Sequence, residues 1–218
     1  MSTTTESLAT TADYFESVYA EAEGDQTRIP WASRHPSTAL VNWLNAVAPS
    51  LVRCGARVAV VGCGLGDDAR EVIRRGYEVT AFDWSPTAVE WARGLDPSHT
   101  ESYTQADLFK PPGRWGHRFD LVVEVNNLQY VPPADQKDTV KALSKFVAPH
   151  GHLLIVCRGA DEPAALDEGP PWPLTERQLA EAADEAGLVT DHGVSCFTDE
   201  ADVKRLRGLF RRTSLSAP

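Results

Sequence analysis

Cysteine, basic charge and long apolar runs are all scarce in this chain of 218 residues. Its four cysteines, Cys54, Cys63, Cys157 and Cys196, lie far apart and form no CxxC pair. This spacing excludes a disulfide framework and a cysteine-ligated zinc site, and it is typical of reduced thiols in a cytoplasmic protein. We expect Cys63 and Cys157 to serve as small core residues, and we expect no metal.

The charge balance is acidic, with 21 Lys and Arg against 31 Asp and Glu, for a formal net charge of −10. Such a surface disfavours the phosphate backbone of nucleic acids and anionic membranes. No apolar stretch approaches the roughly 20 residues that span a bilayer, and the Ser/Thr-rich start does not look like a secretory signal. We therefore expect a small-molecule ligand and a cytoplasmic location. The sequence leaves the oligomeric state open, with a monomer favoured.

The apolar pattern predicts an α/β core at 51–218, preceded by a disordered tail at 1–11 and a helical cap at 12–50. In the cap, one helix is expected around residues 14–19. A second helix follows Pro36, runs through residues 40–47 and is ended by Pro49. Strands are expected at 58–61, 78–82, 102–105, 119–125 and 153–156, with helices at 67–75, 86–93, 135–146 and 175–186. This alternation predicts a parallel sheet covered on both faces. Strand candidates at 188–197 and 203–210 share a short polar link, which predicts an antiparallel hairpin.

A glycine loop, Gly62-Cys63-Gly64-Leu65-Gly66, follows the first predicted strand. Glycines allow a sharp turn and the close approach of a ligand. The dinucleotide pattern GxGxxG would place a glycine at position 67, where this chain has Asp67. A carboxylate at the start of the next helix disfavours a pyrophosphate and suits a ligand with a cationic group.

Two carboxylates end the next two predicted strands. Asp83 lies about 20 residues beyond the loop, where a carboxylate can accept both hydroxyls of a ribose. Asp107 could accept the amino group of an adenine while Leu108 packs on the ring. Either residue alone is commonly a solvated loop residue. Together with the glycine loop they predict a ligand at the carboxyl edge of the sheet.

This set of residues, with the final hairpin, resembles class I S-adenosylmethionine-dependent methyltransferases over roughly residues 58–210. The resemblance implies a Rossmann-like sheet of seven strands, mostly parallel with one antiparallel strand from the C-terminal hairpin, and helices on both faces. It also implies S-adenosylmethionine as cofactor. The cofactor-binding residues expected on this basis are Trp31, Gly62, Cys63, Gly64, Asp83, Trp84, Asp107, Leu108, Glu124 and Val125.

Two further segments, Pro30-Trp31 and Gly169-Pro170-Pro171-Trp172-Pro173, are similar to the thiopurine, thiol and halide methyltransferase subgroup. In that subgroup the Pro-Trp segment folds over the cofactor. Thiopurine enzymes have an Asp-Arg pair where this chain has Glu124-Val125, so the resemblance bears more on the cofactor than on the acceptor.

Methyl transfer is an in-line displacement that needs an aligned nucleophile and a dry site. A thiol with a pKa near ~8.5 is partly ionised at neutral pH and needs no strong base, and none stands out in this sequence. The resemblance to the thiol and thiopurine subgroup therefore implies a thiol acceptor. The alternatives are O- or N-methylation of a secondary metabolite, and a Rossmann-like nucleotide-binding protein without methyl transfer. The catalytic candidates are His35, Asn126, Asn127 and Tyr130, and the candidates for acceptor binding are Tyr14, Tyr19, Arg158 and Trp172. The competing interpretations of these residues are packing, turn formation and surface ion pairs.

Overall fold

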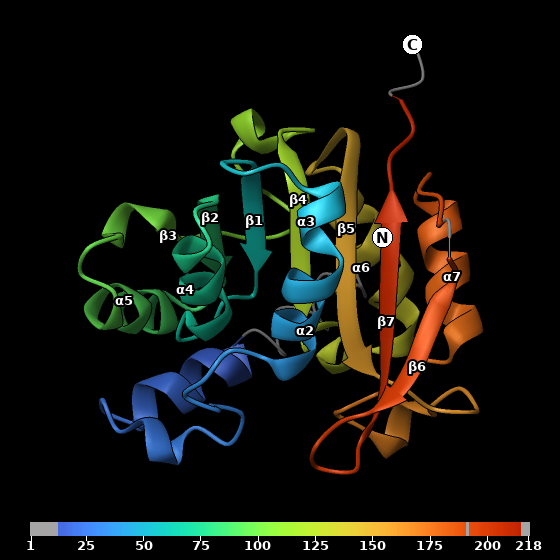
Figure 1. Cartoon of the computed structure of the whole chain (residues 1–218). Coiled ribbons are helices and arrows are strands. Elements are labelled where there is room, and N and C mark those ends of the chain that lie inside the picture. Colours follow the sequence, from blue (N-terminus) through green and yellow to red (C-terminus); the bar gives the residue numbers. More distant parts are fainter. Residues whose placement is uncertain (1–12, 191, 215–218) are drawn as a thin grey trace. The chain divides into compact units, whose positions relative to one another are not determined.

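The computed structural model describes residues 13–190 and 192–214, and the chain divides into two compact units, residues 1–111 and 112–218 (Figure 1). The division falls inside the core expected at 51–218, and the expected cap belongs to the first unit. The tail expected at 1–11 lies outside the described residues.

The first unit contains three parallel strands in the order β3-β2-β1. These are β1 (Arg57–Val61), β2 (Glu78–Asp83) and β3 (Tyr103–Gln105). Its helices are α2 (Thr38–Ala46), α3 (Ala48–Leu51), α4 (Asp67–Arg74) and α5 (Pro86–Leu95), with short turns η1 (Gln26–Arg28) and η2 (Thr100–Ser102). Val61 pairs with Phe82 and Asp83 with Gln105. The carboxyl ends of β1, β2 and β3 therefore meet at one edge.

Pro49 does not end the second cap helix as expected. α2 ends at Ala46, and Pro49 lies in the first turn of the separate helix α3. Proline is tolerated there because the first backbone N–H groups of a helix have no intrahelical acceptor.

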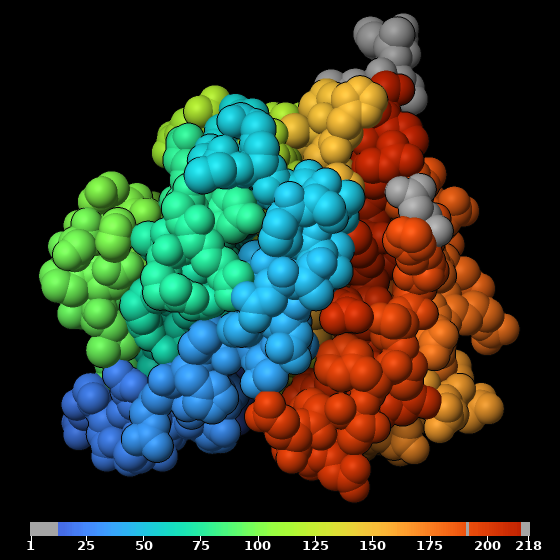
Figure 2. Space-filling model, in the orientation of Figure 1, coloured from blue at the N-terminus to red at the C-terminus, as the bar shows by residue number. Residues whose placement is uncertain are grey.

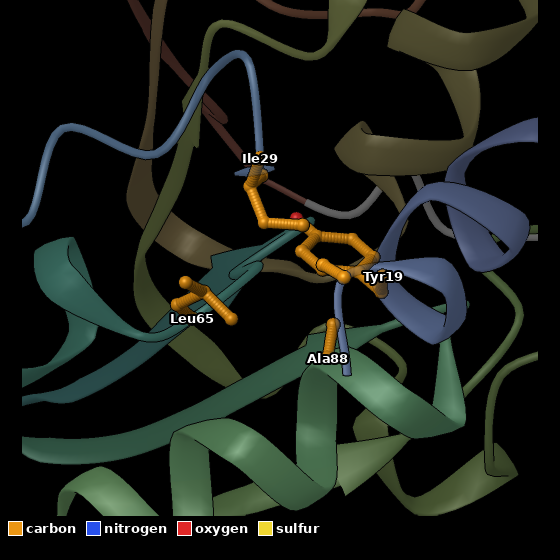
Figure 3. Packing of buried hydrophobic residues seen from close by; sticks show 5 residues of the cluster. Tyr19, Ile29, Leu65 and Ala88 are labelled. Carbon is orange, nitrogen blue, oxygen red and sulfur yellow. The ribbon is translucent and has the colours of Figure 1, made fainter. Parts of the chain in front are cut away.

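The cap packs on the glycine loop and on α5. Residues 13–21 form a helix, and Tyr19, Ala22 and Ile29 are buried in a cluster with Leu65 and Ala88 (Figure 3). Figure 2 shows the cap in blue at the lower left, against the teal and green surface of the same unit. Apolar burial thus holds the N-terminal segment beside the loop that follows β1.

The second unit orders its strands β4-β5-β7-β6. β4 (Phe119–Val125) and β5 (Val147–Arg158) are parallel, whereas β7 (Lys204–Arg211) runs antiparallel to β5 and to β6 (Val194–Thr198). Its helices are α6 (Gln136–Ser144) and α7 (Glu176–Glu185), with turns η3 (Gly113–Trp115), η4 (Leu128–Tyr130), η5 (Pro133–Asp135) and η6 (Leu166–Glu168). The predicted C-terminal hairpin is present.

Two strands start six residues away from their predicted positions, whereas the other strand boundaries agree within two residues. β5 starts at Val147 instead of 153, because its first residues pair with the start of β4 before a register shift. β6 starts at Val194 instead of 188, since Gly193 adopts a left-handed backbone with φ of 72° and Val189 makes only an isolated bridge to Arg211. Within the described residues, no helix is long and apolar enough to cross a membrane.

Candidate functional site

The glycine loop and the carboxylate that ends β2 are in direct contact. The Gly64 N–H donates to Asp83 Oδ2 at 2.8 Å, and the Ser85 N–H donates to Oδ1 at 3.0 Å. Burial raises the pKa of the Asp83 carboxyl, and these N–H groups oppose the rise. A carboxylate has about four lone-pair sites, so Asp83 keeps acceptor capacity for further donors such as ribose hydroxyls.

The other predicted adenosine ligands lie at the neighbouring strand ends. The Ala106 N–H donates to the Asp83 carbonyl at 2.9 Å, which places the segment after β3 beside the end of β2. Asp107 Oδ1 accepts the Phe109 N–H at 2.8 Å. Trp84 is 39% exposed, and its carbonyl accepts the Gln105 amide at 3.2 Å. The structure therefore brings Asp83 and Asp107 to adjacent strand ends, and the half-buried Leu108 follows.

The cap approaches the loop most closely at Gly64. This residue has φ of +49°, and a Cβ added to it would lie 2.9 Å from the Tyr19 hydroxyl. The Trp31 indole N–H donates to that hydroxyl at 2.8 Å. The proton of the Tyr19 hydroxyl has no acceptor among the described residues. Burial raises the Tyr19 pKa, so the hydroxyl stays protonated and can donate to a ligand.

The remaining cap candidates lie farther out. Tyr14 is 53% exposed and its ring centroid lies 6.4 Å from that of Trp31. His35 is exposed, and its Nδ1 lies 3.2 Å from the Pro36 carbonyl. The structure groups Tyr19 and Trp31 at the loop and leaves His35 on the surface.

The carboxylates at the start of α4 already have partners. Asp67 forms an ion pair with Arg70, whose guanidinium also donates to the Leu65 carbonyl. Asp68 Oδ1 accepts the Ser37 N–H at 2.7 Å, and burial raises the Asp68 pKa to about 6. Neither carboxylate is therefore an uncommitted ligand for a cation. Asp67 still occupies the position where a dinucleotide loop has glycine.

In the second unit, Glu124 is 2% exposed at the carboxyl end of β4. Its Oε1 accepts the N–H groups of Asn127 and Leu128, at 2.7 and 3.1 Å. Its Oε2 is buried and has no hydrogen-bond partner in the described part of the chain. Burial raises the Glu124 pKa to about 7. Glu124 closes the turn that follows the strand, and Val125 beside it is half-buried.

The two asparagines beyond β4 have structural partners. Asn126 adopts a left-handed backbone with φ of 65°, and its Oδ1 accepts from Arg205 Nη1 at 2.8 Å. Asn127 Nδ2 donates to the Val125 carbonyl at 3.1 Å. Tyr130 is half-buried in η4. Asn127 therefore contributes to the turn after β4, and Asn126 links this turn to β7.

Arg158 and Trp172 are joined through one buried residue, Gln129. The side-chain oxygen of Gln129 accepts a hydrogen bond from the Arg158 backbone N–H at 2.8 Å. The backbone carbonyl of Gln129 accepts one from the Trp172 backbone N–H at 2.6 Å. Trp172 is 7% exposed, and its indole N–H donates to the Leu166 carbonyl. Gln129 thus holds the backbone of Trp172 close to the backbone of Arg158.

The four thiols fall into two classes by their exposure to solvent. Cys63 and Cys157 are buried, as predicted, whereas Cys54 and Cys196 are exposed. Burial raises the pKa of both buried thiols, which makes them poor nucleophiles. The described residues contain no cluster of His, Cys, Asp and Glu that could hold a metal ion.

Sequence reasoning missed three residues that shape the site: Glu16, Gln129 and Arg205. Glu16 accepts hydrogen bonds from Ser85 Oγ at 2.5 Å and from Thr87 Oγ1 at 2.6 Å, so it ties the cap to the start of α5. An acidic residue near aromatic ones on the first helix is a weak signal for this contact. Nothing local in the sequence indicates the contacts of Gln129 or Arg205.

Residues 58–151 match the model of a family described as a methyltransferase domain. A relative, the ubiquinone biosynthesis O-methyltransferase of Alkalilimnicola ehrlichii, is 35% identical over 102 residues, which are 46% of this chain and 40% of the relative. The chain thus spans less than half the length of this relative. The matched residues include the glycine loop, Asp83, Asp107 and β4.

Two solved structures resemble nearly the whole chain. One is the Burkholderia thailandensis 1,6-didemethyltoxoflavin-N1-methyltransferase, with S-adenosylhomocysteine bound. It has a TM-score of 0.75 and 22% identity, and the match covers 98% of this chain and 92% of that one. The other comes from work on the conversion of a disulfide bond into a thioacetal group during echinomycin biosynthesis. It has a TM-score of 0.73 and 24% identity, with 94% and 93% covered. They confirm the predicted Rossmann-like fold of seven mostly parallel strands.

Proposed function

We propose that this protein transfers a methyl group from S-adenosylmethionine to a small molecule. The observation that carries the proposal is the contact of Asp83 with the Gly64 N–H, at the shared edge of β1 and β2. A carboxylate on a glycine loop, followed by Asp107 at the next strand end, is the arrangement that an adenosine-containing cofactor requires. The match of residues 58–151 to a methyltransferase domain supports the same conclusion.

The residues of the first unit fit this cofactor. Asp83 would accept the ribose hydroxyls, while Asp107 and Leu108 would hold the adenine. Gly62, Cys63 and Gly64 would form the part of the loop that faces the cofactor. A larger residue at position 64 would meet the Tyr19 hydroxyl. The Tyr19 hydroxyl, oriented by Trp31, would donate to the ligand. When bound, the cofactor supplies a methyl group activated by its sulfonium.

The acceptor atom is proposed to be one that ionises without a strong base. His35 is exposed, and the partnerless oxygen of Glu124 is buried out of reach of solvent. A thiol, which is partly ionised at neutral pH, fits this arrangement best. A phenolic oxygen is the second candidate, because the relative from A. ehrlichii is named as an O-methyltransferase.

The cofactor is tested by thermal shift. S-adenosylhomocysteine should raise the unfolding temperature and NAD should not, since a ligand that binds only the native state stabilises it. A shift from NAD alone, or equal shifts from both, would overturn the proposal in favour of a nucleotide-binding protein without methyl transfer.

The acceptor is tested with matched pairs of thiols, phenols and amines on one ring system, with the product identified by its mass. For a thiol, the low-pH limb of the rate profile should move with the pKa of the acceptor, and His35→Ala should change the rate by less than about twofold. If His35 were a general base, the limb would stay at the same pH for every acceptor, and the substitution would lower the rate by about 10²–10⁴-fold.

A further inference from the structure

A cavity of about 500 Å³ lies in the second unit where β5 ends, and Arg158 lines it. This volume is in the range of sites that bind small molecules, roughly 300–1,000 Å³. Val125 of β4 pairs with Val156 of β5, so the cavity lies at the edge of the sheet where these parallel strands end. Ligands bind at this edge in open α/β sheets.

The guanidinium of Arg158 makes no hydrogen bond or ion pair with the described residues, and its Nε is buried without an acceptor. Buried polar atoms nearly always have a partner, so an orphaned N–H on a residue that lines a cavity points to a ligand bound by that residue. Leaving such a donor unmet carries the cost of removing it from water. A ligand oxygen beside Arg158 would remove that cost.

Hydrogen bonds fix the backbone on both sides of Arg158. The Arg158 backbone N–H is held by the buried Gln129, and the Arg158 carbonyl accepts the Leu174 N–H at 3.1 Å. The Ala160 N–H returns a bond to the Leu174 carbonyl at 2.8 Å. These bonds fasten the segment that carries Pro171 and Pro173 to the end of β5.

The rest of the lining indicates what the ligand looks like. Pro163, Pro171, Pro173 and Val203 give the cavity an apolar wall suited to a ring. The two glutamates that line it, Glu162 and Glu168, are exposed to solvent, whereas Arg158 is half-buried. Glu168 also accepts the Ala165 N–H. The cationic group therefore lies inside, and the acidic groups lie where water screens them.

We propose that this cavity recognises a carboxylate on a ring-bearing methyl acceptor, with Arg158 as the group that binds it. A guanidinium matches a planar carboxylate with two parallel N–H···O bonds, which a lysine cannot reproduce. This inference rests on the proposed function in one respect, namely that the ligand is the molecule that receives the methyl group. The binding of the carboxylate itself does not involve the cofactor.

The test uses benzoate as the probe and benzamide as its uncharged isostere. The protein is labelled with ¹⁵N-arginine, and the Arg158 Nε–H signal is assigned by its loss in Arg158→Lys. Benzoate should shift this signal saturably, and benzamide should bind at least tenfold more weakly. Equal shifts from the two probes, or no shift from either, would overturn the proposal.

Two variants sharpen the result. Arg158→Lys, followed through the backbone amides of 159 and 160, should weaken benzoate at least tenfold. Arg177→Lys, on the exposed surface of α7, should change it by less than twofold. An unchanged benzoate affinity in Arg158→Lys would sink the assignment. Should that variant fail to fold, the backbone amides of 159 and 160, assigned independently in the uniformly ¹⁵N-labelled unaltered chain, still decide between benzoate and benzamide.

Activity separates this inference from the proposed function. With carboxylated acceptors, Arg158→Lys should raise KM at least tenfold and change kcat by less than about threefold. Their methyl esters should show no such rise. A chain that binds S-adenosylhomocysteine and methylates acids and esters alike would keep the proposed function and refute the role of Arg158. A chain that does not bind S-adenosylhomocysteine would refute the proposed function, while the benzoate titration would still report on the cavity.

Discussion

At the scale of single residues, Asp83 is where the proposed cofactor site is most sensitive. Asp83→Asn keeps the shape of the side chain and removes its charge. Hydrogen bonds to charged groups are worth about 1.5–3 kcal/mol, against roughly 1 kcal/mol for neutral ones. We expect the Kd for S-adenosylhomocysteine to rise at least tenfold by calorimetry. Glu78→Gln, at the opposite end of β2, should leave it unchanged. A wild-type Kd in Asp83→Asn would contradict the assignment.

Glu124 makes a prediction about pH. Burial raises its pKa from 4.5 to about 7, so the native state binds more protons than the unfolded chain between these values. Stability contributed by the protonated form is therefore lost as pH rises through this window. Between pH 5 and pH 8, wild type should lose up to about 3 kcal/mol relative to Glu124→Gln, measured by urea unfolding.

The control for this prediction has the opposite sign. Pairing with Arg74 and Arg75 lowers the pKa of Glu71, so its stability contribution is lost only below the usual range of a glutamate. The difference between wild type and Glu71→Gln should stay flat from pH 5 to pH 8. A flat profile for Glu124→Gln as well would mean that Glu124 is ionised throughout.

At the scale of elements, the helix at 13–21 is held by Glu16 as well as by apolar packing. Glu16 lies at the N-terminus of α5, where a negative charge is favourable. Glu16→Ala removes its bonds to Ser85 and Thr87. Hydrogen exchange of the 13–21 amides should accelerate at least tenfold, while β1 amides change little. Glu21→Ala, an exposed position on the same helix, is the matched control. Equal acceleration in both variants would assign the effect to helix propensity.

The segment behind Arg158 tolerates little added volume. A Cβ at Gly169 would lie 2.5 Å from Trp172 Nε1, and that indole is buried and bonded to Leu166. Gly169→Ala should therefore lower the free energy of unfolding by about 1–3 kcal/mol. Gly113→Ala, which meets nothing within 4 Å, should change it by less than about 0.5 kcal/mol. Similar values for the two variants would show that the Trp172 ring yields readily.

The regular elements were the most predictable part of the chain. β4 occupies the predicted residues 119–125. This strand was predictable because a run of apolar residues bounded by turn signals is typical of a buried strand. The start of β6 was not predictable, since the apolar pattern does not register the left-handed backbone of Gly193. For the site, residue types at strand ends predicted Asp83 and Asp107. The tie from Glu16 to Ser85 joins residues far apart in the chain and has no local signature.

At the scale of the whole molecule, stability should be independent of redox conditions. All four cysteines are unpaired, so the unfolding temperature should be the same with and without a reductant. A thiol-specific reagent should modify two thiols rapidly in the native protein and all four after denaturation, because burial blocks Cys63 and Cys157. Rapid modification of three or four native thiols would contradict the buried positions.

The distribution of these thiols equips the protein for spectroscopy without any substitution. Cys54 belongs to the first unit and Cys196 to the second, and both are exposed. A nitroxide on each would give one distance distribution by pulsed electron paramagnetic resonance, while the buried thiols remain unlabelled. Recording it with and without S-adenosylhomocysteine would report directly whether the two units move against each other when the ligand binds. The natural cysteines thus provide one labelling site in each of the two units that meet in the sequence at residue 111.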